Sequence, residues 1–221
     1  MTRKIIGMAA LVTTLAIALV GLAVAASLPA DAQLPVHWGL DGQPDRFSDK
    51  WTALLLPALM TGGVSLLLWF LPSLEPRRQG LERSQGLYLA GWIGLLLVGS
   101  AIQLAVVSVA LGWDVPVNRL ISLAVGAMLV LIGNHLGKSR SMYMMGVRTP
   151  WTLASEEVWI RTHRLAGKLM VAAGVLTIIL ALLPARPALM MQGMLVAVLG
   201  AALIPVAYSW WLWRRETQAS E

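Results

Sequence analysis

Six long apolar runs dominate this sequence and leave little room for any fold other than a bundle of membrane-spanning helices. An α-helix needs about 20 apolar residues, with a range of roughly 17–25, to cross the hydrocarbon core of a bilayer. Inside lipid, every backbone N–H and C=O group must find a partner within its own segment, so these runs are predicted to be helices. The runs cover residues 5–28, 51–74, 87–111, 120–136, 165–183 and 189–213. The sequence therefore predicts an all-α, polytopic membrane protein with six transmembrane helices.

The composition agrees with this prediction. Hydrophobic residues make up 57% of the 221 residues and charged residues make up 13%, whereas soluble domains have about 25% charged residues. The chain has no cysteine, so disulfide bonds, thiolate catalysis and cysteine-ligated zinc are excluded. No charged residue lies in the middle of a run. This argues against a proton pump or an ion-coupled transporter, because such proteins carry ionisable groups along their pathway.

The distribution of lysine and arginine predicts the orientation in the membrane. If the N terminus is cytoplasmic, all but four of the 17 basic residues fall on the cytoplasmic side. The four on the outer side are Arg46, Lys50, Arg119 and Arg186. This asymmetry follows the positive-inside rule, so the net charge of +6 needs no nucleic-acid partner. Both termini are therefore predicted to be cytoplasmic.

The first run has two interpretations. Arg3 and Lys4 precede it, and residues 30–32 (ADA) resemble the small-residue cleavage site of a signal peptide. Its apolar stretch is much longer than the roughly 7–15 residues of a signal peptide, which favours a retained anchor. Both interpretations leave residues 29–50 outside the cell membrane.

Residues 29–50 form a polar loop within a two-helix unit predicted to cover residues 1–74. The three prolines and two glycines of this loop predict turns instead of a long helix. Two interpretations stay open. In one, the loop is a small folded cap that recognises an extracytoplasmic ligand through His37, Trp38 and the acidic residues. In the other, it is a solvated connector anchored by its aromatic side chains.

Residues 133–168 form a second polar segment, within a four-helix unit predicted to cover residues 87–213. The segment reads GNHLGKSRSMYMMGVRTPWTLASEEVWIRTHRLAGK. Pro150 disfavours helix at the residue before it. Thr152 or Ser155 is predicted to cap the helix that follows, because its side-chain oxygen can accept from a free backbone N–H. Glu156 and Glu157 in the first turn of that helix would complement its positive end.

This helix is predicted to be short and to lie along the inner leaflet before the chain turns at Gly167. Trp159 would face the membrane interface. Glu157 and Arg161 are spaced four residues apart in the order that favours an ion pair.

Arg148 and Trp151 lie three residues apart in the irregular part of the segment. They are predicted to form a cation–π contact with each other or to bind the phosphate of an anionic lipid. A simpler interpretation treats the whole segment as an amphipathic connector whose basic residues hold anionic lipid.

The side chains that catalysis needs are scarce. The predicted topology separates His37 from His135 and His163, which excludes a zinc site with three histidines. A site made of the two cytoplasmic histidines with Glu156 or Glu157 is compatible with the sequence, but the HExxH and GxSxG motifs are absent. We therefore predict a protein that is not an enzyme and that holds no metal or cofactor.

Both polar loops resemble the SdpI family of bacterial membrane proteins. The motif LPVHWGLDGQPDRFSDKW is similar to the family's N-terminal domain of uncharacterised function, and GN…K…GVRTPWTLASEEVWIRTHRLAGKL is similar to the SdpI signature. The namesake of the family protects a producing cell against a secreted membrane-active toxin, and it is similar to a receptor that can hold a regulatory protein at the membrane. The resemblance implies a multi-pass protein of the bacterial inner membrane that gives immunity by binding or sequestering a toxic peptide.

The resemblance also implies which residues contact a ligand or partner. On the outer side these are His37, Trp38, Gly42 and Asp45. On the cytoplasmic side they are Gly133, Asn134, Lys138, Gly146, Arg148, Thr149, Pro150, Trp151, Thr152, Leu153, Glu157, Trp159, Thr162, His163, Arg164 and Gly167. Two other functions stay open: a receptor that docks a cytoplasmic regulator through residues 148–168, and an intramembrane enzyme or transporter for a hydrophobic substrate.

Overall fold

The structure, a computed structural model, describes residues 3–219 and contains within them six helices that are long and apolar enough to span a membrane. They are α1 (Arg3–Ser27), α2 (Lys50–Leu74), α4 (Gln85–Ala110), α5 (Val117–Leu136), α7 (Glu156–Leu182) and α8 (Pro187–Ala219). Each helix covers one of the predicted runs to within one residue at its end, so the prediction of an all-α polytopic membrane protein is confirmed. The predicted cytoplasmic ends of the chain, residues 1–2 and 220–221, lie outside the described residues.

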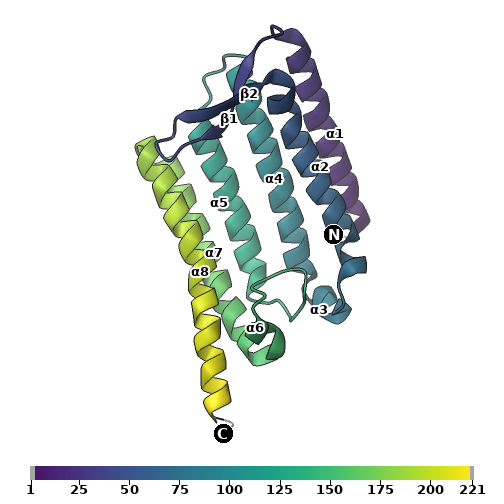
Figure 1. Cartoon of the computed structure of the whole chain (residues 1–221), viewed down its shortest axis with the longest axis vertical. Helices are drawn as coiled ribbons and strands as arrows, with labels where there is room; N and C mark the ends of the chain where they lie inside the picture. Colours follow the sequence, from purple (N-terminus) through teal and green to yellow (C-terminus); the bar gives the residue numbers. More distant parts are fainter. Residues whose placement is uncertain (1–2, 220–221) are drawn as a thin grey trace.

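The helices pack in two groups that meet between α4 and α5 (Figure 1). In the first group, α1, α2 and α4 contact one another, and in the second, α7 packs on both α5 and α8. The start of α1, the last turns of α8 and the short helices α3 (Arg78–Arg83) and α6 (Pro150–Ala154) all lie toward the same end of the bundle. We call this the loop end, because it also carries residues 137–149, and we call the opposite end the hairpin end.

The hairpin end carries a two-stranded antiparallel sheet, which was not predicted from the sequence. Strand β1 (Gln33–Trp38) pairs with strand β2 (Pro44–Asp49), and the register is irregular on both sides of His37. A turn joins the strands, in which the N–H of Gly42 donates to the carbonyl of Gly39 at 2.9 Å. Gly42 has a φ of +80°, a conformation that glycine adopts without steric cost. Residues 29–50 are therefore a folded cap that lies across the helix ends (Figure 1).

The hairpin is fixed to the bundle at its base and at its tip. At the base, the buried ammonium of Lys50 donates to the carbonyl of Leu28, just beyond the end of α1, at 2.6 Å. Leu34 of β1 is buried in an apolar cluster with residues of α1, α2 and α4. At the tip, the side-chain amide of Asn118 on α5 donates to the carbonyl of Gly42 at 2.8 Å. These contacts hold the cap in one position over the helices.

The prediction of a short helix along the inner leaflet is wrong. Helix α7 runs without a break from Glu156 to Leu182, and Trp159 is fully buried instead of facing the interface. Gly167 does not end a helix but marks the place where α7 crosses α5. A Cβ atom on Gly133 would lie 2.8 Å from the carbonyl oxygen of Gly167 and from the nitrogen of Val171. Glycine allows this close approach of the two backbones.

Candidate functional site

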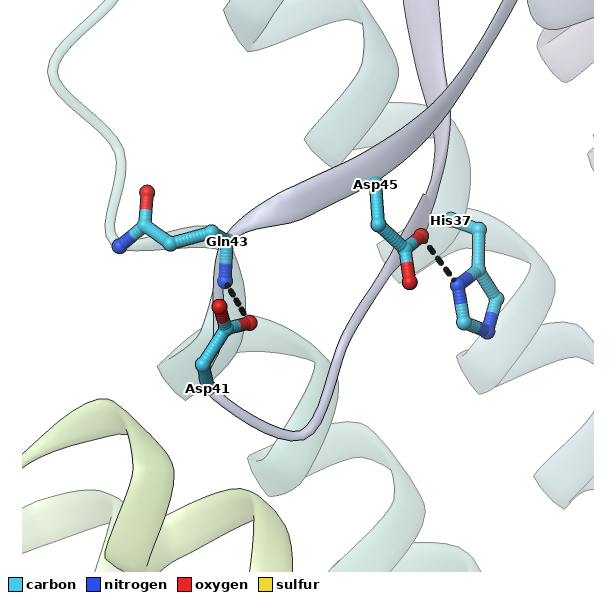
Figure 2. Close-up of polar contacts among 4 residues, drawn as sticks. All are labelled: His37, Asp41, Gln43 and Asp45. Atoms are coloured by element: carbon cyan, nitrogen blue, oxygen red, sulfur yellow. Dashed lines mark hydrogen bonds and ion pairs between the residues drawn. The ribbon is translucent and has the colours of Figure 1, made fainter.

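The hairpin brings together two of the predicted outer residues. The Nδ1 atom of His37 lies 2.6 Å from a carboxylate oxygen of Asp45, and the two side chains are 47% and 50% exposed. Figure 2 shows the pair beside the turn, where the carboxylate of Asp41 accepts a hydrogen bond from the N–H of Gln43 at 3.0 Å. An exposed imidazole and carboxylate in fixed positions offer hydrogen bonds to a ligand that approaches from solvent.

The hairpin also exposes apolar side chains. Leu40 and Phe47 are 50% and 57% exposed, and Val36 is 36% exposed. Trp38, a further predicted outer residue, is half-buried in β1. A surface that mixes exposed apolar groups with a fixed polar pair is typical of an interaction site.

At the loop end, a buried carboxylate that the sequence did not single out organises residues 137–149. Glu75 follows the last turn of α2 and is 2% exposed. Its oxygens accept hydrogen bonds from the backbone N–H of Tyr143 at 3.0 Å, of Met144 at 2.8 Å and of Arg77 at 2.8 Å. Hydrogen bonds to an ionised group are stronger than those between neutral groups, so Glu75 holds the loop against the end of α2.

Arg77, two residues further on, binds the same region from the other side. Its guanidinium donates to the hydroxyl of Ser141 and, at 3.0 Å, to the carbonyl of Leu153. The guanidinium carbon also lies 4.8 Å from the centre of the Tyr143 ring. The sequence shows Glu75 and Arg77 only as charges after an apolar run. Apart from the bond between the two residues themselves, their partners lie more than sixty residues away in the chain, and no local pattern identifies them.

His163 lies inside the protein and not on a ligand-binding surface. Its ring stacks on Trp159, with ring centres 3.9 Å apart, and both side chains are fully buried. The Nε2 atom accepts a hydrogen bond from the N–H of Val147 at 2.9 Å, and Nδ1 lies 2.8 Å from the carbonyl of Trp159. These partners require a neutral ring with its proton on Nδ1. Gly146 has a φ of +106°, and a Cβ atom there would lie 2.5 Å from Nε2, so glycine is what allows this contact.

The histidines do not assemble a metal site. Within residues 3–219, no group of three or more histidine, aspartate or glutamate side chains is placed to hold a metal ion. Both nitrogens of His163 already have partners. The site of His135, His163 and a glutamate that was compatible with the sequence is therefore not formed.

Two threonines shape the start of α6. Thr149 is its N-cap, and Thr149 and Thr152 form a reciprocal capping box, which satisfies backbone groups at a helix start. Thr152 is fully buried and donates from its hydroxyl to the carbonyl of Val147 at 2.7 Å. Ser155 then caps α7, as one of the two predicted alternatives stated.

The predicted cation–π contact between Arg148 and Trp151 is not present. Arg148 donates instead to the carbonyl of Tyr143 at 2.8 Å. The indole N–H of Trp151 donates to the hydroxyl of Ser209 on α8 at 2.6 Å, and its ring stacks on Trp213. Trp151 therefore joins the loop to the last helix.

The structure divides the predicted residues of the loop end into three sets by exposure, and Gly133 and Gly167 are buried where α5 and α7 meet. The fully buried set comprises Thr152, Trp159, Thr162 and His163. The exposed set comprises Asn134, Lys138, Gly146, Arg148, Pro150, Glu157 and Arg164, and Thr149, Trp151 and Leu153 are half-buried. The predicted ion pair between Glu157 and Arg161 is present at 3.9 Å. Most aromatic and hydroxyl side chains of the motif are thus part of the core.

These features define a multi-pass membrane protein with a hairpin cap at one end and an internally hydrogen-bonded loop at the other. Residues 138–209 match the SdpI/YfhL protein family, and residues 12–61 match a domain of unknown function, DUF1648. Over these residues the chain is similar to the SdpI family.

A named relative shows the same similarity. The chain is 25% identical over 183 residues to the "Immunity protein SdpI" of Bacillus subtilis (strain 168), which covers 83% of this chain and 84% of the relative. No solved structure matches the chain. At the level of the family, these similarities support an immunity-type function in a membrane.

Proposed function

We propose that this protein gives its cell immunity to a membrane-active peptide toxin by binding the toxin at the hairpin end. The observation that carries the proposal is the fixed cap on which the His37–Asp45 pair is exposed beside apolar side chains such as Phe47. A membrane-active peptide carries both polar and apolar groups, which such a surface can contact together. Because the hairpin is already held at its base and tip, binding would order little additional chain.

The proposal places the hairpin end outside the cell, in agreement with the distribution of lysine and arginine. It also assigns the protein a binding role without catalysis. The internal hydrogen bonds of His163 support this assignment, because a ring with both nitrogens engaged has no free base to offer. The location in a bacterial inner membrane is part of the same proposal.

Survival assays test the proposal directly. The chain would be expressed in a Bacillus subtilis strain that lacks its own immunity protein, and the strain would be challenged with the toxin it no longer resists and with other membrane-active peptides. We expect the wild-type chain to restore survival against at least one of them. We expect His37→Ala and Phe47→Ser to lose protection while the amount of protein in the membrane stays unchanged.

Gln33→Ala provides the matched control, because Gln33 is an exposed side chain on the same hairpin, away from the pair. This variant should protect as well as the wild type. Absence of protection by a correctly inserted wild-type chain would contradict the proposal. Full protection by the His37 and Phe47 variants would instead remove the hairpin as the binding surface.

A second candidate function is a receptor that docks a cytoplasmic regulator at the loop end. Two exposed side chains of the loop, which we call its rim, favour this function. They are Tyr143 and Met144, which are 42% and 37% exposed, and Glu75 holds their backbone in place. Cross-linking in membranes would compare the wild type with Arg148→Ala, using Arg83→Ala, an exposed arginine of α3 outside residues 148–168, as the control. Identical sets of cross-linked proteins in all three samples would argue against docking at this rim.

A further inference from the structure

A groove of about 750 Å³ runs along the contact between α5 and α7 at the loop end. Its floor includes Gly133, Gly137 and Gly167. These residues lack side chains, so the two helices approach closely and leave a channel on the outer surface of the bundle. The mouth of the groove lies at the opposite end of the molecule from the hairpin, and no residue of the hairpin lines the groove, so the proposed toxin site does not use it.

Three cations line the mouth of this groove. Lys138, Arg164 and Lys168 are all exposed, and no acidic residue lines the groove. Arg164 and Lys168 are four residues apart on one helix, a spacing at which like charges repel each other. Within residues 3–219, the side chains of these three cations have no hydrogen bond or ion pair. The nearby acid Glu157 is paired with Arg161. The groove therefore has an unbalanced positive charge that an anion would offset.

Beyond the cations, the groove becomes apolar. Val175, Leu176 and Ile179 line it and are 43%, 46% and 47% exposed. At 1.5 Å per residue, the helix rises about 16 Å between Lys168 and Ile179. This is close to half the hydrocarbon thickness of about 30 Å of a bilayer. The groove thus has a cationic mouth and an apolar part about as long as one leaflet.

We propose that this groove binds an anionic phospholipid of the leaflet at the loop end. The phosphate contacts Lys138, Arg164 and Lys168, and an acyl chain lies along Val175 and Ile179. The distribution of lysine and arginine predicts that this is the cytoplasmic leaflet. Basic pockets between transmembrane helices on that side are suited to phosphate headgroups. Three cations favour a lipid with two phosphates over one with a single phosphate, and a zwitterionic lipid binds most weakly.

Lipid binding to the purified full-length protein tests the site. Native mass spectrometry in a neutral detergent would compare cardiolipin, phosphatidylglycerol and phosphatidylcholine with the same acyl chains. We expect affinity to fall in that order. Each removed cation should lower the affinity for cardiolipin about fivefold, so the combined variant K138Q/R164Q/K168Q should lower it on the order of a hundredfold.

A matched triple variant separates the groove from the general charge of the loop end. K4Q/R78Q/R83Q removes the same number of exposed cations from outside the groove and should bind cardiolipin nearly as the wild type does. Equal weakening by the two triple variants would overturn the proposal, because attraction would then depend only on net charge. Equal affinity of the wild type for phosphatidylcholine and cardiolipin would overturn it as well.

Two further measurements distinguish a lipid from a soluble anion. Val175→Trp narrows the apolar part and keeps all three cations, so it should weaken cardiolipin binding and leave the binding of inorganic pyrophosphate unchanged. Binding of pyrophosphate by the wild type as tightly as cardiolipin would overturn the lipid assignment in favour of a soluble phosphate. Thermal unfolding without added lipid checks that each variant is folded.

Discussion

The two ends of the molecule use polar residues in opposite ways, and two histidines show the difference. His37 at the hairpin end is about half exposed and has a carboxylate partner that is also exposed. His163 at the loop end is fully buried, stacks on Trp159 and binds backbone groups. The first histidine is available to a ligand, whereas the second is part of the structure that holds the loop. A residue in a family motif can therefore serve either recognition or folding, and its exposure distinguishes the two.

The same contrast predicts different consequences of substitution. Exposed ion pairs contribute at most about 1 kcal/mol to stability. A buried donor or acceptor that loses its partner costs about 1–3 kcal/mol, and more when a charge is involved. Substitutions at the loop end should therefore lower stability, while substitutions at the hairpin pair should change recognition with little effect on stability.

The largest effect is expected at Glu75. Glu75→Ala leaves the N–H groups of Tyr143 and Met144 without their buried acceptor. We expect the free energy of unfolding to fall by about 3–5 kcal/mol, measured by denaturant or thermal unfolding in detergent. The control is Glu82→Ala, since Glu82 is an exposed glutamate on the neighbouring helix α3. Similar losses in the two variants would show that Glu75 does not hold the loop.

The two histidines provide the next test. His163→Phe keeps an aromatic ring on Trp159 but removes the acceptor for the N–H of Val147, so we expect a loss of about 1–3 kcal/mol. His37→Phe should change the free energy of unfolding by no more than about 0.5 kcal/mol. Unfolding of both variants under one set of conditions measures the difference. Equal stability losses would contradict the division between an internal and an exposed end.

The six membrane-spanning helices were predictable because the bilayer allows few alternatives. Within lipid, a long apolar run must satisfy its own backbone, so its length and composition are sufficient to identify a helix. The hairpin was not predictable by the same means. Pro35 and Pro44 lie within its strands, and proline is depleted in strands. The prolines and glycines of the loop predicted turns, but not the pairing of the strands on either side of the turn at Gly42.

The candidate site residues of the loop end were predicted from the resemblance, but their positions in the fold were not. Trp159 and His163 lie one helical turn apart, a spacing that is equally compatible with a surface and with a core. Their burial depends on Met142 and Gly146, which reach them through an irregular loop. That loop is in turn held by Glu75. Contacts over such long separations leave no periodic signal in the sequence.

Two glycines at the hairpin end differ in how closely neighbouring residues approach them. Gly42 and Gly112 both have positive φ, of +80° and +67°, so alanine adds backbone strain of about 1–2 kcal/mol at each. At Gly42 the new Cβ would also lie 2.6 Å from Cβ of Pro187 and 2.8 Å from the amide of Asn118, whereas Gly112 has no neighbour within 4 Å. We expect Gly42→Ala to lower stability by about 1 kcal/mol more than Gly112→Ala, because the bond to Asn118 is also lost.

Protection assays should separate these variants as well. Gly42→Ala should displace the tip of the hairpin and reduce survival in the presence of toxin, while Gly112→Ala should retain it. Equal protection by both would indicate that the position of the hairpin tip does not matter for recognition.

The smallest effect is expected at the junction of the hairpin and α2. Asp49 caps α2 by accepting from the N–H groups of Trp51 and Thr52, both at 3.0 Å. Hydrogen bonds from Thr52, followed by the one from the backbone of Trp51, hold the pKa of Asp49 below its usual 3.8. Because the folded-state pKa is lower than the unfolded one, the carboxylate stabilises the fold above about pH 4 and loses this contribution as the pH falls through the lowered pKa.

Asp49→Asn isolates this contribution, because asparagine also caps a helix but does not titrate. Unfolding of the wild type and of Asp49→Asn would be followed from pH 7 to pH 3. We expect similar stability at pH 7 and a steeper loss for the wild type below pH 4. Parallel curves would show that protonation of Asp49 does not change the stability of the fold. The difference should be small, because Asp49 is exposed and water screens its charge. A polar group of the hairpin end thus adjusts stability slightly, whereas Glu75, a carboxylate of the same chemistry buried at the loop end, determines whether its loop is held at all.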